Sequence, residues 1–195
     1  MSGHHPSAPI AGQVRHIESL LEQRGVIAPG EIDRRIDALL AGGSPLNGAR
    51  IVARAWTDPA FRDRLLADAN TAIRELELSM GGGEELRLKV IANGPGEHHV
   101  VVCTLCSCYP TTLLGPSPTW YKSDAYRARV VRDPRGVLGE FDLELPADTR
   151  ITVWDASAES RYMVLPRRPE GTDALTETEL AALVTRNGLI GTALV

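Results

Sequence analysis

The strongest constraint on this chain is the position of its three cysteines, which all fall within residues 103–108. They stand at Cys103, Cys106 and Cys108, in the pattern Cys-x-x-Cys-x-Cys. Three cysteines cannot all pair with one another, and disulfides at this spacing would be strained. Thiolates are good ligands for soft metal ions, and the spacing bends the chain around one point. We therefore expect one metal ion here, with the backbone amide nitrogens of Ser107 and Cys108 facing the same point.

A structural zinc site is the main alternative from spacing alone, because clusters of cysteines in proteins most often hold zinc. Zinc usually takes four ligands in a tetrahedron, and the chain contains only three cysteines. The fourth ligand would have to be His98, His99 or water. On this interpretation the protein is an interaction module without catalytic chemistry.

The segment from Cys103 to Pro110, which reads Cys-Thr-Leu-Cys-Ser-Cys-Tyr-Pro, resembles the metal-binding signature of the nitrile hydratase alpha subunit. The resemblance continues over roughly the C-terminal two thirds of the chain. It includes Gly115, Trp120-Tyr121-Lys122-Ser123, the segment from Tyr126 to Val131, Val153-Trp154-Asp155, Glu159, Arg161-Tyr162, Leu165-Pro166 and Arg168-Pro169.

This resemblance implies one low-spin trivalent cobalt or iron ion per chain. By position, Cys103 is the axial thiolate, Cys106 becomes a sulfinate and Cys108 a sulfenate, and the amide nitrogens of Ser107 and Cys108 complete the protein ligands. Thr104 resembles the cobalt type, whereas the iron type usually has serine there. We therefore expect Co³⁺, with iron the less favoured ion.

The resemblance also implies an activity and partners. The expected enzyme is a hydro-lyase that adds water to a nitrile to give the amide, with Cys106 and Cys108 as its catalytic residues. The attacking oxygen is hydroxide on the metal, a nearby water or the sulfenate oxygen of Cys108, and we favour the last. A beta-type subunit would supply two arginines to the oxidised sulfurs, and an activator protein would insert the metal. The catalytic subunit of thiocyanate hydrolase shares the cysteine pattern and is the alternative function.

Further residues match family positions around the metal. Asp155, Glu159 and Arg161 are expected to support the site from behind, although such charges are as often ordinary surface groups. Trp120 is a candidate for the substrate pocket. Relatives usually carry tryptophan soon after Tyr-Pro, whereas this chain has Thr111-Thr112, which predicts a wider pocket and a bulkier or heteroaromatic nitrile.

Charge and hydropathy exclude several other classes of function. The net charge of −4 and the absence of a basic run argue against a nucleic-acid or anionic-membrane partner. No apolar run approaches the length of a membrane span. The N-terminal residues do not resemble a secretory signal, so we expect a cytoplasmic protein.

Residues 1–80 are expected to be helical. Apolar residues recur at helical spacing over 13–24 and 32–40, and Ser44-Pro45 and Asp58-Pro59 each predict a further helix start, the latter for a helix through residue 73. The first two helices have little chain to cover them. We therefore expect residues 1–80 to be an extension that packs on a partner subunit.

Residues 81–195 are expected to form the α+β catalytic domain that carries the metal. After Gly81-Gly82-Gly83 the pattern changes to alternation, which predicts strands over 86–91 and 99–102 with a turn at 93–96. Further strands are predicted over 126–131, 151–154 and 162–165, and a short helix over 134–141. A capping box at Thr176 and Glu179 predicts a helix through Leu183. The resemblance implies a layered helix-sheet-sheet-helix arrangement for this domain.

Overall fold

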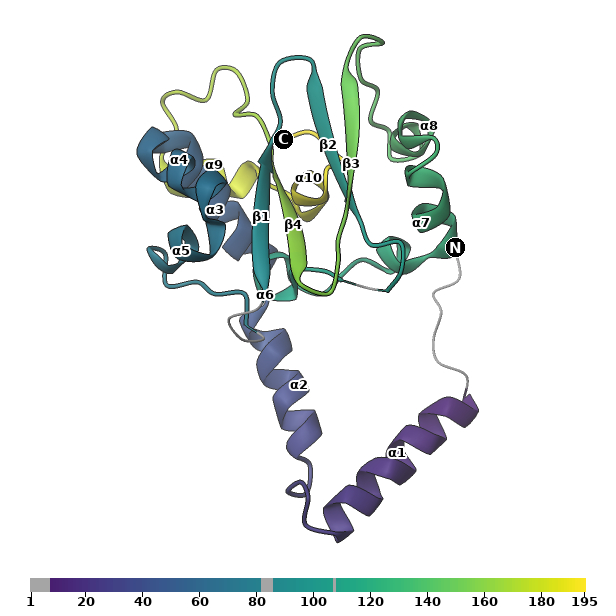
Figure 1. Cartoon of the computed structure of the whole chain (residues 1–195). Coiled ribbons are helices and arrows are strands. Elements are labelled where there is room, and N and C mark those ends of the chain that lie inside the picture. Colours follow the sequence, from purple (N-terminus) through teal and green to yellow (C-terminus); the bar gives the residue numbers. More distant parts are fainter. Residues whose placement is uncertain (1–7, 82–85, 107) are drawn as a thin grey trace.

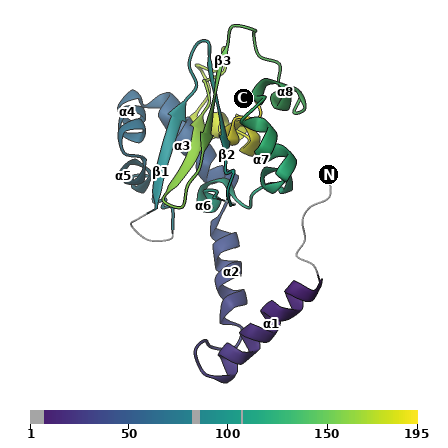
Figure 2. The ribbon, with the colours of Figure 1, turned by 45° about the vertical axis from the view of Figure 1, so that its right-hand side comes forward.

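Two long helices project from a body in which shorter helices pack around strands (Figures 1 and 2). The structure is a computed structural model and describes residues 8–81, 86–106 and 108–195. Part of the predicted glycine break, Gly82-Gly83, lies outside the described residues. No helix in these ranges is both long and apolar enough to cross a membrane.

Helices come first along the chain, and strands alternate with short helices thereafter. The projecting helices are α1 (Ala8–Gln23) and α2 (Glu31–Gly42). The body contains α3 (Pro45–Thr57), α4 (Pro59–Ala67), α5 (Ala69–Arg74), β1 (Arg87–Ala92), β2 (Glu97–Val102), α6 (Thr111–Leu114), the 3₁₀-helix η1 (Thr119–Lys122), α7 (Asp124–Val130), α8 (Pro134–Gly139), β3 (Arg150–Asp155), β4 (Ser160–Leu165), α9 (Glu177–Leu183) and α10 (Arg186–Ile190).

The strands form two parallel pairs that place the cysteines at one edge. β1 pairs with β4, and β2 pairs with β3 so that Val102 lies opposite Asp155. β4 contacts β2, and the two pairs therefore lie side by side (Figure 1). The carboxyl ends of β2 and β3 meet at the same edge, and Cys103 follows β2 there. The expected α+β class, with a helical N-terminal arm and helices layered on sheets, is confirmed.

The hydrophobic core joins residues from both halves of the chain. Ile51 on α3 and Phe61 on α4 are fully buried in the same cluster as Leu180 on α9 and Leu189 on α10. α4 and α5 contact β1, and α10 contacts β2 and β4. Helices α4 and α5 thus pack on β1, and α3 packs on α4, α6 and α9. Of the described helices, only α1 and α2 project from the body (Figure 1). The division into 1–80 and 81–195, with the first part on a partner subunit, stays a proposal.

One predicted strand was wrong. Residues 126–131 do not form a strand, because most of them belong to α7. The alternating pattern is too short to override the cap at Ser123, whose hydroxyl accepts a hydrogen bond from the Tyr126 backbone N–H at 3.2 Å. Tyr126 and Val130 are four residues apart and both buried, which is the spacing of a helix face.

The other predicted elements are present with small shifts. The helix expected from Pro59 to residue 73 divides into α4 and α5, because the side chain of Asp68 accepts the Thr71 N–H and starts a new helix. The strands over 86–91, 99–102, 151–154 and 162–165 are confirmed, as is the helix that begins at Pro134. The capping box between Thr176 and Glu179 is also confirmed.

Candidate metal centre

The three cysteine side chains converge directly after β2. The Sγ atoms of Cys103 and Cys106 are 3.3 Å apart, those of Cys106 and Cys108 are 3.0 Å apart, and all three lie within 4.8 Å of one another. Cys103 and Cys108 are buried, whereas Cys106 is exposed. The three sulfurs therefore surround one point that is open on the Cys106 side. This is the arrangement that a single metal ion requires of three ligands.

Asp155 holds the first half of the cysteine loop from the end of β3. The backbone N–H of Thr104 donates to Asp155 Oδ1 at 2.9 Å, and its hydroxyl donates to Asp155 Oδ2 at 2.5 Å. The register of β2 and β3 brings these residues together, because Val102 lies opposite Asp155. Asp155 is thus close to the predicted site, and its contact is with Thr104.

The segment from η1 to α7 holds the loop from another side by donating to backbone carbonyls. Tyr121 Oη donates to the Cys108 carbonyl at 3.1 Å, and Tyr126 Oη donates to the Val101 carbonyl at 2.7 Å. The Arg127 guanidinium donates to the Cys106 carbonyl at 2.9 Å. Burial raises the pKa of both tyrosines, which keeps their hydroxyls protonated as donors.

A raised pKa keeps the Cys108 thiol protonated in the metal-free chain. Burial raises the pKa of the Cys108 thiol to about 12, and its hydrogen bond with Cys106 acts in the same direction. The positive charge of Arg161 opposes this rise in the pKa. Arg161 itself donates to the backbone carbonyls of Ser157, Ala158 and Ser160. A thiolate at Cys108 thus needs more positive charge than Arg161 supplies, and a bound metal ion would supply it.

The two histidines of β2 lie apart from the cysteine cluster. Within the described ranges, the potential ligands that converge there are the three cysteines. His98 Nε2 is 2.7 Å from the Gly191 carbonyl oxygen, and Trp154 Nε1 donates to His99 Nδ1 at 3.3 Å. Both histidines are committed elsewhere, so a tetrahedral zinc site completed by either of them is not formed.

Three further predicted site residues make contacts with groups other than the sulfurs. Glu159 accepts a hydrogen bond from the Ser157 hydroxyl at 3.1 Å and is exposed. Trp120 packs edge-on against Tyr126 and Phe141 at 4.9 and 4.7 Å between ring centroids, so it belongs to an aromatic cluster. Thr111 begins α6 and is half-buried. Ser107, a predicted ligand through its amide nitrogen, lies outside the described residues.

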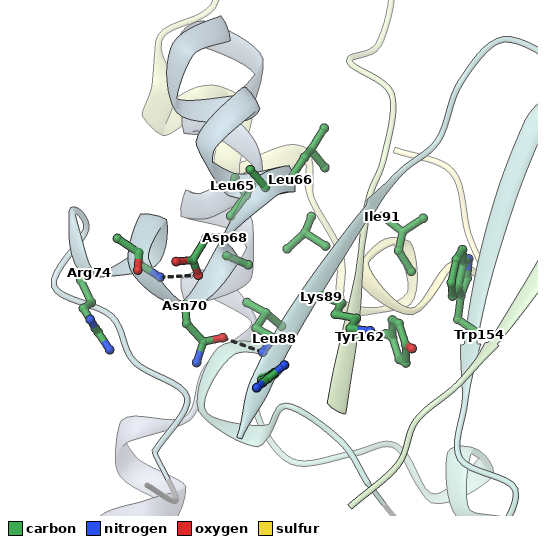
Figure 3. Close-up of a pocket in the computed structure, with 15 residues that line it drawn as sticks. Leu65, Leu66, Asp68, Asn70, Arg74, Leu88, Lys89, Ile91, Trp154 and Tyr162 are labelled. Carbon is green, nitrogen blue, oxygen red and sulfur yellow. Dashed lines mark hydrogen bonds between the residues drawn. The ribbon is translucent and has the colours of Figure 1, made fainter. Parts of the chain in front are cut away.

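Two hollows of different character lie on the body. One of about 620 Å³ borders the cysteine loop and is lined by Thr104, Asp124, Arg127, Ala128, Val131, Arg132 and Asp155. The other, of about 800 Å³, runs between α4, α5 and β1 and contains no cysteine (Figure 3). In the second, the Asn70 amide pairs with the Leu88 N–H and the Leu86 carbonyl at the free edge of β1. The roomier hollow is therefore separate from the candidate metal chemistry.

Sequence reasoning missed Arg127 as a residue of the site. With 126–131 expected to be a strand, its side chain had no defined neighbour. The signal that could have found it is Ser123 directly before Asp124, because serine is a favoured N-cap and an acidic residue is favoured in the first turn of a helix. On a helix, Asp124 and Arg127 are neighbours, and their ion pair is 2.7 Å long. Arg129, the other arginine of α7, pairs with Glu140 instead.

Comparison with known proteins agrees with this geometry. Residues 8–193 match the family described as nitrile hydratase, alpha chain. The low-molecular weight cobalt-containing nitrile hydratase subunit alpha of Rhodococcus rhodochrous is 48% identical over 199 residues, covering 98% of this chain and 95% of that protein. The thiocyanate hydrolase subunit gamma of Thiobacillus thioparus is 46% identical over 158 residues, covering 76% of this chain and 65% of that protein.

Solved structures show the same fold. A double mutant of the Fe-type nitrile hydratase from Comamonas testosteroni Ni1 superposes with a TM-score of 0.89 and 40% identity, covering 97% of this chain and 92% of that chain. The match therefore extends over the projecting helices as well as the body. Together with the convergent cysteines, it shows that this chain belongs to the nitrile hydratase alpha chain family.

Proposed function

We propose that this chain is the metal-binding subunit of a nitrile hydratase, which adds water to a nitrile to give the amide. The observation that supports this most directly is the convergence of the Cys103, Cys106 and Cys108 sulfurs within 4.8 Å of one another, in a chain of this family. Three sulfurs fit a soft or borderline transition-metal ion well.

Cobalt is the ion we propose, as Co³⁺ and one per chain. The Rhodococcus relative described above is named as cobalt-containing, and Thr104 resembles the cobalt type. The fold does not discriminate between the two metals, because the Comamonas structure of iron type superposes over nearly the whole chain. Iron is therefore the second choice.

The ligands in this proposal are the Cys103 thiolate, the Cys106 sulfinate, the Cys108 sulfenate and the amide nitrogens of Ser107 and Cys108. When bound, the ion would supply Lewis acidity, which would polarise the carbon–nitrogen triple bond of the substrate. The Cys108 sulfenate oxygen attacks the nitrile carbon. Water then delivers a new oxygen to this sulfur as the bond from sulfur to the product oxygen breaks. In each turnover the amide oxygen thus comes from the sulfenate, the water oxygen restores the sulfenate, and both water hydrogens end on the amide nitrogen.

Asp155, Glu159 and Arg161 support the loop in this proposal and do not react. Asp155 fixes Thr104 through two hydrogen bonds, and Arg161 adds positive charge near Cys108. A beta-type subunit would cover the open side at Cys106 and donate two arginines to the oxidised sulfurs. An activator protein would insert the cobalt.

Thiocyanate hydrolysis is the second candidate, because a thiocyanate hydrolase subunit is 46% identical to this chain. The test is to offer the cobalt-loaded complex an aliphatic nitrile and thiocyanate in parallel. Amide formation with little release of products from thiocyanate supports the hydratase. Faster turnover of thiocyanate would instead identify the hydrolase, and turnover of neither by a fully loaded complex would contradict both.

A bulky or heteroaromatic nitrile is the substrate class that we propose. Thr111 and Thr112 stand where relatives usually have tryptophan, and Thr111 is half-buried at the start of α6. Thr111 and Trp120 would line the entrance. Replacing Thr111 by tryptophan should lower kcat/KM for a heteroaromatic nitrile more than for an acrylonitrile-sized one. If the parent enzyme already prefers the small nitrile strongly, the proposed pocket is wrong.

A further inference from the structure

We propose that Arg127 is a positioning residue for the metal centre, which holds the cysteine loop in the arrangement that binds the ion. This inference rests on the proposed function. One guanidinium nitrogen of Arg127 donates to the Cys106 carbonyl at 2.9 Å, and another contacts Asp124 Oδ1 at 2.7 Å. Arg127 thus connects helix α7 to the middle cysteine of the motif.

The tip of the cysteine loop depends on such polar contacts because it is not held by packing. Leu105 is 91% exposed, and Cys106 is exposed beside it. Cys103 and Cys108, at the ends of the loop, are buried in the core cluster. Burial therefore fixes the two outer sulfurs, whereas the exposed Cys106 is also held through its backbone, whose N–H donates to Cys103 Sγ at 3.3 Å and whose carbonyl accepts from Arg127.

Two of the contacts that hold the loop come from different elements. Asp155 on β3 accepts both donors of Thr104, and Arg127 on α7 donates to the Cys106 carbonyl. Arg127 would therefore restrain the backbone of Cys106, and with it the direction in which the Cys106 side chain carries its sulfur.

The geometry of the contact explains why the residue is an arginine. The side chain of Arg127 is 23% exposed, and its helix places it against the loop while Asp124 holds the outer nitrogen. A guanidinium offers several donors in a rigid fork, so it can contact two acceptors at once. Lysine would reach one acceptor at a time and would restore only part of the effect.

The test compares Arg127→Gln with Arg129→Gln in the reduced, metal-free full chain. Both variants lose one positive charge and one ion pair from α7, but Arg129 pairs with Glu140 and not with the loop. We expect Arg127→Gln to bind Co²⁺ about tenfold more weakly, the effect of losing one hydrogen bond from a charged donor. Its thiolate-to-cobalt absorption bands should shift, Arg127→Lys should recover part of the affinity, and Arg129→Gln should match the parent.

Each other outcome has a definite meaning. Parent-like affinity and absorption for Arg127→Gln would overturn the inference while leaving the proposed function intact. If the parent chain itself shows no thiolate-to-cobalt absorption, the proposed function fails and this inference fails with it. If Arg127→Gln does not fold, Asp124→Asn replaces it, because this variant keeps the arginine and removes its carboxylate partner. An affinity loss of about threefold is then expected, and an unchanged affinity overturns the inference.

Discussion

His98 and His99 are adjacent residues of β2 that are both buried, and neither has a carboxylate hydrogen-bonded to its ring in the described ranges. Burial lowers the pKa of each histidine below its ordinary value of 6.5, and for His98 the nearby Gly191 carbonyl only partly offsets this. Both residues are therefore held neutral in the folded protein. A proton binds them more readily in the unfolded chain, which has consequences for stability.

The free energy of unfolding should fall as the pH falls below about 6.5, because these histidines then bind protons in the unfolded chain but not in the folded chain. The contribution of the two neutral histidines to the free energy of unfolding is fully present above this pH. It is lost progressively as the pH falls toward the lowered pKa that the histidines have in the folded chain. We expect His98→Gln to have a shallower pH dependence of its free energy of unfolding between roughly pH 5 and 7, measured by urea unfolding. Part of the pH dependence should remain in this variant, because His99 is still present.

His16→Gln is the matched control, because His16 is exposed on α1. It should reproduce the pH dependence of the parent chain. An unchanged slope in His98→Gln would show that proton uptake at this residue does not contribute to the stability profile.

The cysteines themselves could be predicted to converge, because covalent spacing confines three sulfurs that lie within six residues. Their supporting contacts could not. Arg127 and Tyr121 donate to the carbonyls of Cys106 and Cys108, and a backbone carbonyl has no signature in the sequence. Which carbonyl points outward depends on the path of the loop, and this path is determined only when α7 and β3 have packed on it.

Among the secondary-structure elements, α10 makes an unusually close approach to β2. Gly191 ends α10 with φ at +91°, and a Cβ atom there would overlap the His99 carbonyl oxygen and crowd the Val100 Cα. Gly191 also offers its own carbonyl to His98. This position therefore needs glycine for two reasons, the left-handed conformation and the lack of space.

Comparing Gly191→Ala with Gly171→Ala should separate the cost of the left-handed conformation from the cost of the missing space. Gly171 has φ at +76°, but a Cβ atom added there would meet nothing within 4 Å. We expect Gly171→Ala to cost about 1 kcal/mol of unfolding free energy for the conformation alone. Gly191→Ala should cost about 2 kcal/mol more, since the strand or the helix must move. Equal losses in urea unfolding would contradict the close contact between α10 and β2.

Periodicity predicted most of the elements but failed at α7. Long amphipathic stretches such as residues 13–24 and 32–40 contain enough turns for the helical period to be recognised. The six residues 126–131 alternate over too short a range to distinguish the two periods, and the cap at Ser123 decides the outcome. The pairing of β1 with β4 and of β2 with β3 was also beyond sequence reasoning, because it is set by contacts between segments about 50 to 70 residues apart.

Across the molecule as a whole, α1 and α2 extend away from the body (Figure 2). Helix α1 carries a stripe of exposed apolar side chains. Val14 and Ile17 on α1 are 58% and 56% exposed, and Ile10 and Leu20 lie along the same helix with 51% and 37% exposure. A helix with such a stripe gains little stability by itself in water. In an alpha chain of a family whose relatives are named as subunits, we propose that the beta-type subunit covers this stripe.

Replacing both Val14 and Ile17 by lysine should therefore weaken assembly with the beta-type subunit by at least about tenfold, because two buried apolar side chains would be lost from the contact. The free energy of unfolding of the isolated chain should change little. Analytical ultracentrifugation of the mixed subunits measures the assembly, and urea unfolding of the isolated chain measures its free energy of unfolding.

Gln13→Lys combined with Gln23→Lys is the control, since it adds the same charge to exposed polar positions of α1. Its assembly should match the parent. If the apolar variant also assembles like the parent chain, α1 does not contact the partner through this stripe. The exposure of the arm was foreseeable from the sequence because its apolar residues have so little chain beside them, but its direction relative to the body was not.

The proposed function depends above all on Cys103, Cys106 and Cys108 holding one cobalt ion, with two of the three sulfurs oxidised. Metal analysis of the full chain, produced with cobalt available, should be combined with the mass of the peptide that contains all three cysteines. We predict one cobalt per chain, with two added oxygens on Cys106 and one on Cys108. Zinc bound to three unmodified thiols would contradict this prediction and would favour a structural site.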